Sequence, residues 1–165
     1  MDFIHYTLQW TKGEILEAAI FGTFGLITII VSFLFWKFGE TPNAKALLIP
    51  LIVVGIFFAG AGVSGVISNQ KRMSKFEKAY SQNPSVFIQN EKERVEGFQY
   101  LYTMTLIIAT ISFVLATGFF WFSGNHILKA IGIALILLGL TGLVIDYFSK
   151  ERADIYYEKI LEHNN

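Results

Sequence analysis

The chain has 165 residues, of which 53% are hydrophobic and only 16% are charged, and its mean hydropathy is +0.50. Soluble domains usually carry about 25% charged residues, so this composition excludes an ordinary soluble domain. The 13 basic and 13 acidic residues cancel, so net charge gives no reason to expect nucleic-acid binding. Cysteine is absent, which excludes thiol catalysis, thiolate metal sites and disulfide exchange.

The first predicted element is a short amphipathic helix over residues 2–12. Phe3, Ile4, Thr7 and Leu8 fall on one face of such a helix. An apolar face flanked by polar residues is typical of a helix that lies flat at a membrane surface. We therefore expect this segment to lie at the cytoplasmic interface.

Four long apolar runs follow in the chain. The first three contain no charged residue and the fourth contains only Lys129; the runs cover residues 18–36, 46–70, 97–125 and 127–145. A bilayer core about 30 Å thick needs roughly 20 helical residues, so each run is long enough to span it. The sequence predicts an all-α integral membrane protein with four transmembrane helices and one membrane domain, 1–165.

Two turns and one long connection separate the runs. Residues 39–43 and 123–126 form the short turns, and Pro50 predicts a mild kink near the start of the second span. Asn83 and Pro84 predict a helix N-cap followed by the first helical position. The second and third spans are therefore expected to extend from the membrane as a helical hairpin, and the fourth to continue as a helix to about residue 161.

The distribution of basic residues predicts the orientation. Only Lys37, Lys45 and Lys129 lie near the two short turns, while the other basic residues lie in the long connection and near the termini. The positive-inside rule therefore places both termini in the cytoplasm, and we expect the membrane to be the plasma membrane or bacterial inner membrane.

The chain carries signs of an internal repeat. Trp36 and Gly39 share a Trp-x-x-Gly pattern with Trp121 and Gly124, and residues 76–78 resemble residues 157–159. We predict two tandem hairpins, about 1–83 and about 84–165. Because each repeat holds two spans, the copies have parallel topology, unlike inverted-repeat transporters.

Small residues at helical spacing predict the faces along which the spans pack, because helices in lipid associate where their backbones approach closely. A ligand groove or pore lining is the alternative interpretation of the same residues. The predicted packing residues are Ala18, Gly22, Gly55, Ala59, Ala61, Gly65, Ser112, Ala116, Gly139 and Gly142.

Two carboxylates are candidates for function inside the membrane. Glu17 and Asp146 are the acidic residues that can enter the hydrocarbon, both at the cytoplasmic ends of spans. Such groups carry protons or bind cations in many membrane proteins. The alternative is interfacial anchoring, with Lys12 or Lys150 as partners.

The long connection contains the best candidate for specific recognition. Its charges alternate in sign between two rigid spans, and a solvated helix face is the alternative. The residues are Glu91, Lys92, Glu93, Arg94 and Glu96.

No catalytic motif accompanies these features. The sequence has no phosphate-binding loop and no nucleophile elbow, and its three histidines are scattered over both sides, so we expect no metal and no cofactor. This favours a non-enzymatic protein that associates with another membrane protein, such as a bacterial immunity or accessory protein, or with a second copy. The alternatives are a small oligomeric transporter or a cation or proton channel that uses Glu17 and Asp146, and a lipid- or quinone-handling enzyme.

Overall fold

The computed structural model describes residues 2–163 and consists of six helices in that range. They are α1 (Phe3–Phe38), α2 (Pro42–Ala46), α3 (Leu48–Gln82), α4 (Pro84–Phe98), α5 (Tyr100–Phe122) and α6 (His126–His163). Four helical segments are long and apolar enough to cross a membrane: α1, α2 with α3, α4 with α5, and α6. The predicted all-α membrane fold is therefore confirmed.

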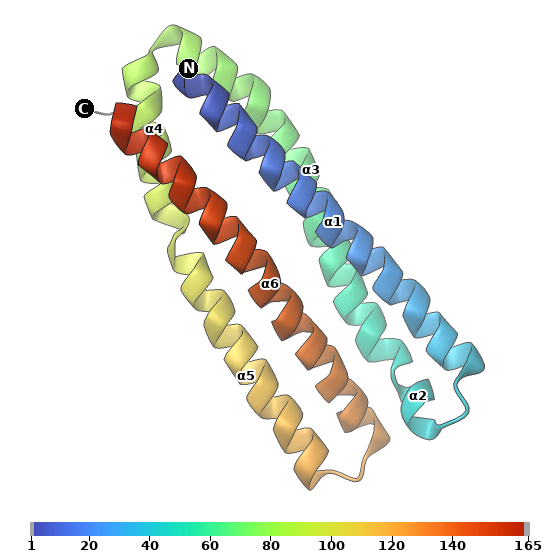
Figure 1. Ribbon diagram of the computed structural model, residues 1–165. Coiled ribbons are helices and arrows are strands. Elements are labelled where there is room, and N and C mark those ends of the chain that lie inside the picture. The colour runs from blue at the N-terminus through green and yellow to red at the C-terminus, as the bar shows by residue number, and fades with distance from the viewer. Residues whose placement is uncertain (1, 164–165) are drawn as a thin grey trace.

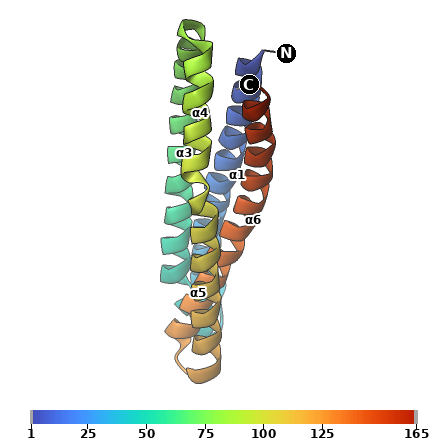
Figure 2. The ribbon, with the colours of Figure 1, turned by 90° about the vertical axis from the view of Figure 1, so that its left-hand side faces the viewer.

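The helices form two hairpins that lie side by side (Figure 1). α1 packs along α3, and α5 packs along α6. The turns of both hairpins lie at one end of the elongated molecule, which we call the turn end. The two described termini and the α3–α4 connection lie at the other end, which we call the head (Figure 2).

Local sequence explains where these helices begin and break. The side chain of Asn83 accepts a hydrogen bond from the backbone N–H of Val86 at 3.1 Å, and Pro84 occupies the first turn of α4, as the sequence predicts. Pro50 has no N–H for the carbonyl of Ala46, which lies four residues earlier. The helix is consequently interrupted at Leu47, between α2 and α3.

The expectation for residues 2–12 is wrong. This segment is the start of the unbroken helix α1, not a separate helix that lies flat on the membrane. Phe3, Thr7 and Trp10 are buried against the other helices of the head. The face that the sequence assigned to lipid headgroups packs against protein instead.

A second correction concerns the start of the third span. The sequence predicts continuous helix into this span, but α4 ends at Phe98 and α5 begins at Tyr100. The N–H of Gln99 bonds to the carbonyl of Glu96, three residues earlier, which tightens the turn. The helix axis can therefore change direction where the span meets the head.

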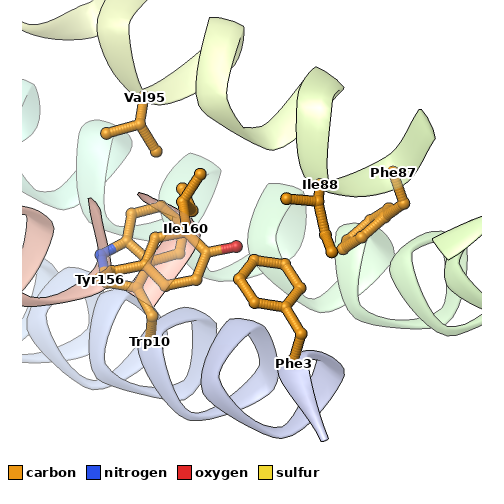
Figure 3. Close-up of a cluster of buried hydrophobic side chains, with 7 residues drawn as sticks. All are labelled: Phe3, Trp10, Phe87, Ile88, Val95, Tyr156 and Ile160. Carbon is orange, nitrogen blue, oxygen red and sulfur yellow. The ribbon is translucent and has the colours of Figure 1, made fainter. Parts of the chain in front are cut away.

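The head has its own core, separate from the spans. Phe3, Trp10, Phe87, Ile88, Val95, Tyr156 and Ile160 are buried together there, and we call them the head core (Figure 3). The Trp10 ring stacks on Tyr156 with centroids 5.1 Å apart, and Phe3 stacks on Tyr156 at 6.0 Å. Because α1, α4 and α6 all contribute, this core joins the two hairpins at the head.

Candidate functional site

Backbone contact between glycines holds the first hairpin together. A Cβ atom on Gly62 would lie 2.4 Å from the Cα of Gly22, and one on Gly25 would lie 2.3 Å from the backbone nitrogen of Ala59. Such distances are impossible for real atoms, so only glycine lets α1 and α3 approach this closely. Gly65 faces Ala18 in the same interface.

The structure places nearly all the predicted packing residues between helices. Gly55 faces Gly25 in the first hairpin; in the second, Ala116 faces Gly132, Gly139 faces Ala109 and Phe113, Gly142 faces Thr105, and Ser112 is buried. Ala61 requires a correction, because it is exposed and its neighbour Gly62 occupies the interface. Gly25 was not predicted, whereas Gly62 belongs to the dense run of small residues at 59–62 that predicts close packing of this helix.

The face of α3 that does not meet α1 also carries small residues. Gly60 has no neighbouring atom within 4 Å of an added Cβ, unlike Gly55 and Gly62. Gly60 and Ser64 line an open hollow of about 500 Å³ together with Ile56, Ala59, Val63 and Ile67 of α3 and, at its edge, Ile29 of α1. We call this the free face of α3.

Glu17 and Asp146 line one polar cavity of about 550 Å³, where the spans meet the head. All the long helical segments contribute polar side chains to this polar cavity: Glu14 and Glu17 from α1, Asn69 and Arg72 from α3, Arg94 from α4, Tyr102 from α5, and Asp146 and Ser149 from α6. The structure therefore brings together two residues that are far apart in sequence.

The two carboxylates differ in their partners. Arg152 of α6 donates to the carboxylate of Glu14 at 3.0 Å and also to that of Glu17. Oδ2 of Asp146 is enclosed and has no hydrogen-bond partner among the described residues. Lys150, the predicted partner of Asp146, pairs with Asp154 instead, at 2.7 Å.

Sequence reasoning missed Arg152 as the partner of Glu17. The sequence does contain a pattern that places Arg152 on the inner face of α6, because Ser149, Arg152 and Tyr156 recur at helical spacing. The register between α1 and α6, which decides the pairing, is a property of the folded head.

The predicted recognition segment divides into an inner and an outer face. Glu91 is 3% exposed and Arg94 is half-buried, so these two side chains belong to the interior. Glu93 and Glu96 are exposed, and Lys92 is half-buried. The prediction that this segment recognises a partner therefore stays a prediction only for the outer face, Lys92, Glu93 and Glu96.

The inner face forms a buried hydrogen-bonded chain. Arg94 donates to both carboxylate oxygens of Glu91, at 2.9 and 2.6 Å. The Tyr156 hydroxyl donates to Glu91 at 2.8 Å and lies 2.8 Å from the Thr7 hydroxyl, which must then be the donor because Tyr156 has one proton to give. Burial, followed by the nearby Glu91 carboxylate, raises the pKa of Tyr156 above its ordinary value.

Aromatic rings enclose the guanidinium of Arg94 in this chain. It lies 4.7 Å from the ring centre of Trp10 and 5.5 Å from that of Phe76. A charge in such surroundings is stable only while its partner is present. These contacts connect α1, α4 and α6, so we interpret them as a structural element that holds the three helices together in the head.

Within residues 2–163, no group of three or more His, Cys, Asp or Glu side chains is placed to hold a metal ion. The chain matches no family model, no curated protein and no solved structure.

Proposed function

We propose that this multi-pass membrane protein is non-enzymatic and works by associating with a transmembrane helix of another membrane protein, as an immunity or accessory protein does. The observation that carries the proposal is the free face of α3. On the adjoining face of the same helix, glycines bring α1 into backbone contact. A second run of small residues, Gly60 and Ser64, offers a further helix the same close approach, and this face is open.

The rest of the molecule suits a docking role. The head core and the Glu91–Arg94 pair hold both hairpins at one end, so the free face of α3 is carried by a rigid hairpin. On α4, the exposed carboxylates of Glu93 and Glu96 and the half-buried Lys92 can contact the polar part of the same partner.

Cross-linking from the free face tests the proposal directly, because the chain has no cysteine to interfere. Ser64→Cys is labelled with a photoreactive maleimide in native membranes and then illuminated. We expect one discrete adduct, with a partner that mass spectrometry identifies, and we expect Gly60→Leu in the same chain to diminish it by filling the hollow. Val114→Cys on α5, where the side chain is 67% exposed, is the matched control.

Two outcomes contradict the proposal. If Ser64→Cys gives no more adduct than Val114→Cys, the free face of α3 is not a docking site. An adduct of twice the protein's own mass would identify a second copy of this chain as the occupant, in place of a different membrane protein.

One observation favours a second function, a small oligomeric transporter or a cation or proton channel. Asp146 lines the polar cavity without a cationic partner among the described residues, as a carboxylate that exchanges a proton or cation does. Glu17 is less suited, because Arg152 already neutralises it. Proton or cation flux in liposomes that disappears in Asp146→Asn would favour this function over association.

A further inference from the structure

An apolar cleft of about 580 Å³ lies between α1 and α6 in the spans. Its lining runs from Gly13 to Phe24 along α1 and from Leu140 to Arg152 along α6. At about 1.5 Å per helical residue, both stretches are roughly 16–18 Å long, which is about half of a hydrocarbon core about 30 Å thick. The cleft therefore extends through one leaflet of the membrane, the leaflet on the side of the head.

The cleft faces lipid and not the interior of the bundle. Each residue along its rim is more than half exposed, and these residues are Leu16, Ile20, Leu140, Val144 and Phe148. Phe21 and Phe24 close the cleft on its inner side, because both rings pack on Phe58 of α3. An apolar cleft that has the length of one leaflet and opens to lipid fits one acyl chain.

The head end of this cleft is charged. Glu17 and Arg152 are the two charged residues of its lining, and Arg152 donates from Nη2 to the carboxylates of both Glu14 and Glu17. Gly13 leaves room for this contact, because a Cβ there would lie 3.1 Å from Nε of Arg152. The three charged side chains, which we call the mouth of the cleft, are between 17% and 32% exposed, so a headgroup can reach them.

The mouth has more carboxylates than guanidiniums, also when the adjoining polar cavity is included. The carboxylates that line the two spaces or bond to their lining are Glu14, Glu17, Glu91 and Asp146, and the guanidiniums are Arg72, Arg94 and Arg152. Four negative charges thus face three positive charges. The surplus negative charge favours an occupant that brings a cation.

Two carboxylate oxygens at the mouth are free to accept hydrogen bonds from such a cation. Oε2 of Glu14 and Oε1 of Glu17 accept no hydrogen bond from the described residues, and Arg152 bonds to the other oxygen of each. Both free oxygens are accessible, unlike the enclosed Oδ2 of Asp146. Nη1 of Arg152 is accessible in the same way. The mouth therefore offers acceptors for a cation beside donors for an anion.

We propose that the cleft and its mouth bind a phospholipid of the head-side leaflet whose headgroup ends in a primary ammonium. One acyl chain lies in the cleft, the ammonium donates to the free oxygens of Glu14 and Glu17, and the phosphate accepts from Nη1 of Arg152. A choline headgroup has the same charges but no N–H donor, and a glycerol headgroup has no cation. The site is separate from the free face of α3, so it does not depend on the proposed association.

Native mass spectrometry of the full chain in a mild detergent tests the site with three lipids of matched chains: phosphatidylethanolamine, phosphatidylcholine and phosphatidylglycerol. We expect one bound phosphatidylethanolamine per protein, held about tenfold more tightly than either of the others, because hydrogen bonds between charged groups contribute that much. Phosphoethanolamine, the soluble headgroup, is expected not to displace the lipid at the same concentration, since it lacks the chains.

Two variants separate the mouth from the cleft. Glu17→Gln removes the surplus charge and leaves Glu14 to pair with Arg152, and it is expected to bring the binding of phosphatidylethanolamine to within about twofold of that of phosphatidylcholine. Val144→Trp fills the cleft and is expected to weaken both lipids several-fold while their ratio stays the same. Glu151→Gln, exposed on α6, removes the same charge elsewhere and is the matched control.

Four results would overturn the proposal. The first is equal binding of phosphatidylethanolamine and phosphatidylcholine by the unaltered protein, which would mean that the cleft holds any membrane lipid. The second is a preference that survives in Glu17→Gln, and the third is lipid binding that is unchanged in Val144→Trp. The fourth is displacement of the lipid by phosphoethanolamine, which would assign the mouth to a soluble amine.

Discussion

Glu91→Ala is expected to lower the free energy of unfolding of the head by about 3–5 kcal/mol, the usual cost of removing one partner of a buried ion pair. The Glu91 side chain is 4% exposed and accepts from both Arg94 and Tyr156. Without it, the guanidinium of Arg94 stays between aromatic rings with no counter-charge. Thermal unfolding followed by near-ultraviolet circular dichroism, which reports the stacked Trp10 and Tyr156 rings, measures the loss.

A matched substitution on the same helix isolates the effect of burial. Glu93→Ala removes an exposed carboxylate that bonds only to Gln89, and we expect it to change stability by less than about 0.5 kcal/mol. The double variant Glu91→Leu with Arg94→Met is expected to recover much of the loss, because it removes the buried carboxylate together with its half-buried guanidinium partner. Equal stabilities of Glu91→Ala and Glu93→Ala would show that the buried pair does not hold the head.

Gly62→Leu is expected to destabilise the first hairpin by about 3 kcal/mol, at the upper end of the usual cost of overpacking. The new side chain would meet the backbone of Gly22, where a Cβ alone already comes within 2.4 Å. Backbone cannot move aside as a flexible side chain does, so α1 and α3 must separate. Unfolding by sodium dodecyl sulfate in mixed micelles measures this change.

The matched control lies two residues away. Gly60→Leu places the same side chain on the free face of α3, where nothing lies within 4 Å, and we expect its stability to stay within about 0.5 kcal/mol of the unaltered protein. If Gly62→Leu proved as stable as Gly60→Leu, the close approach of α1 and α3 would not be what holds the hairpin.

Much of the fold can be predicted from the sequence, because the signals are local. Runs of apolar residues longer than the bilayer is thick determine the spans, and the Asn83–Pro84 pair determines the start of α4. The break at Leu47 follows from Pro50 by the same kind of argument. Each of these features depends on residues that are neighbours along the chain.

The parts that could not be predicted depend on rotation and register between helices. In the run of small residues at 59–62, the rotation of α3 about its axis decides that Gly62 meets α1 and Gly60 does not. The pairing of Glu17 with Arg152 joins the two ends of the chain. The face of α1 that contains Phe3 and Thr7 has the same pattern whether it covers lipid or protein.

The internal repeat stays a prediction, and one pair of contacts agrees with it. Phe3 and Phe87 are 84 residues apart, close to the 85-residue spacing of the two Trp-x-x-Gly motifs, and their rings lie 6.2 Å apart in the head core. Equivalent residues of a duplicated unit meet in this way near the axis that relates the two copies. The Trp-x-x-Gly motifs lie at the turn end of both hairpins.

Cysteine accessibility tests the central claim, that four helices cross the membrane with the head in the cytoplasm. Single cysteines replace Glu77 and Glu158 in the head and Glu40 and Asn125 at the turn end, all of which are exposed. A membrane-impermeant maleimide is expected to label only the two turn-end positions in intact cells, and all four after permeabilisation. Labelling of either head position in intact cells, or of one turn-end position without the other, would contradict the account.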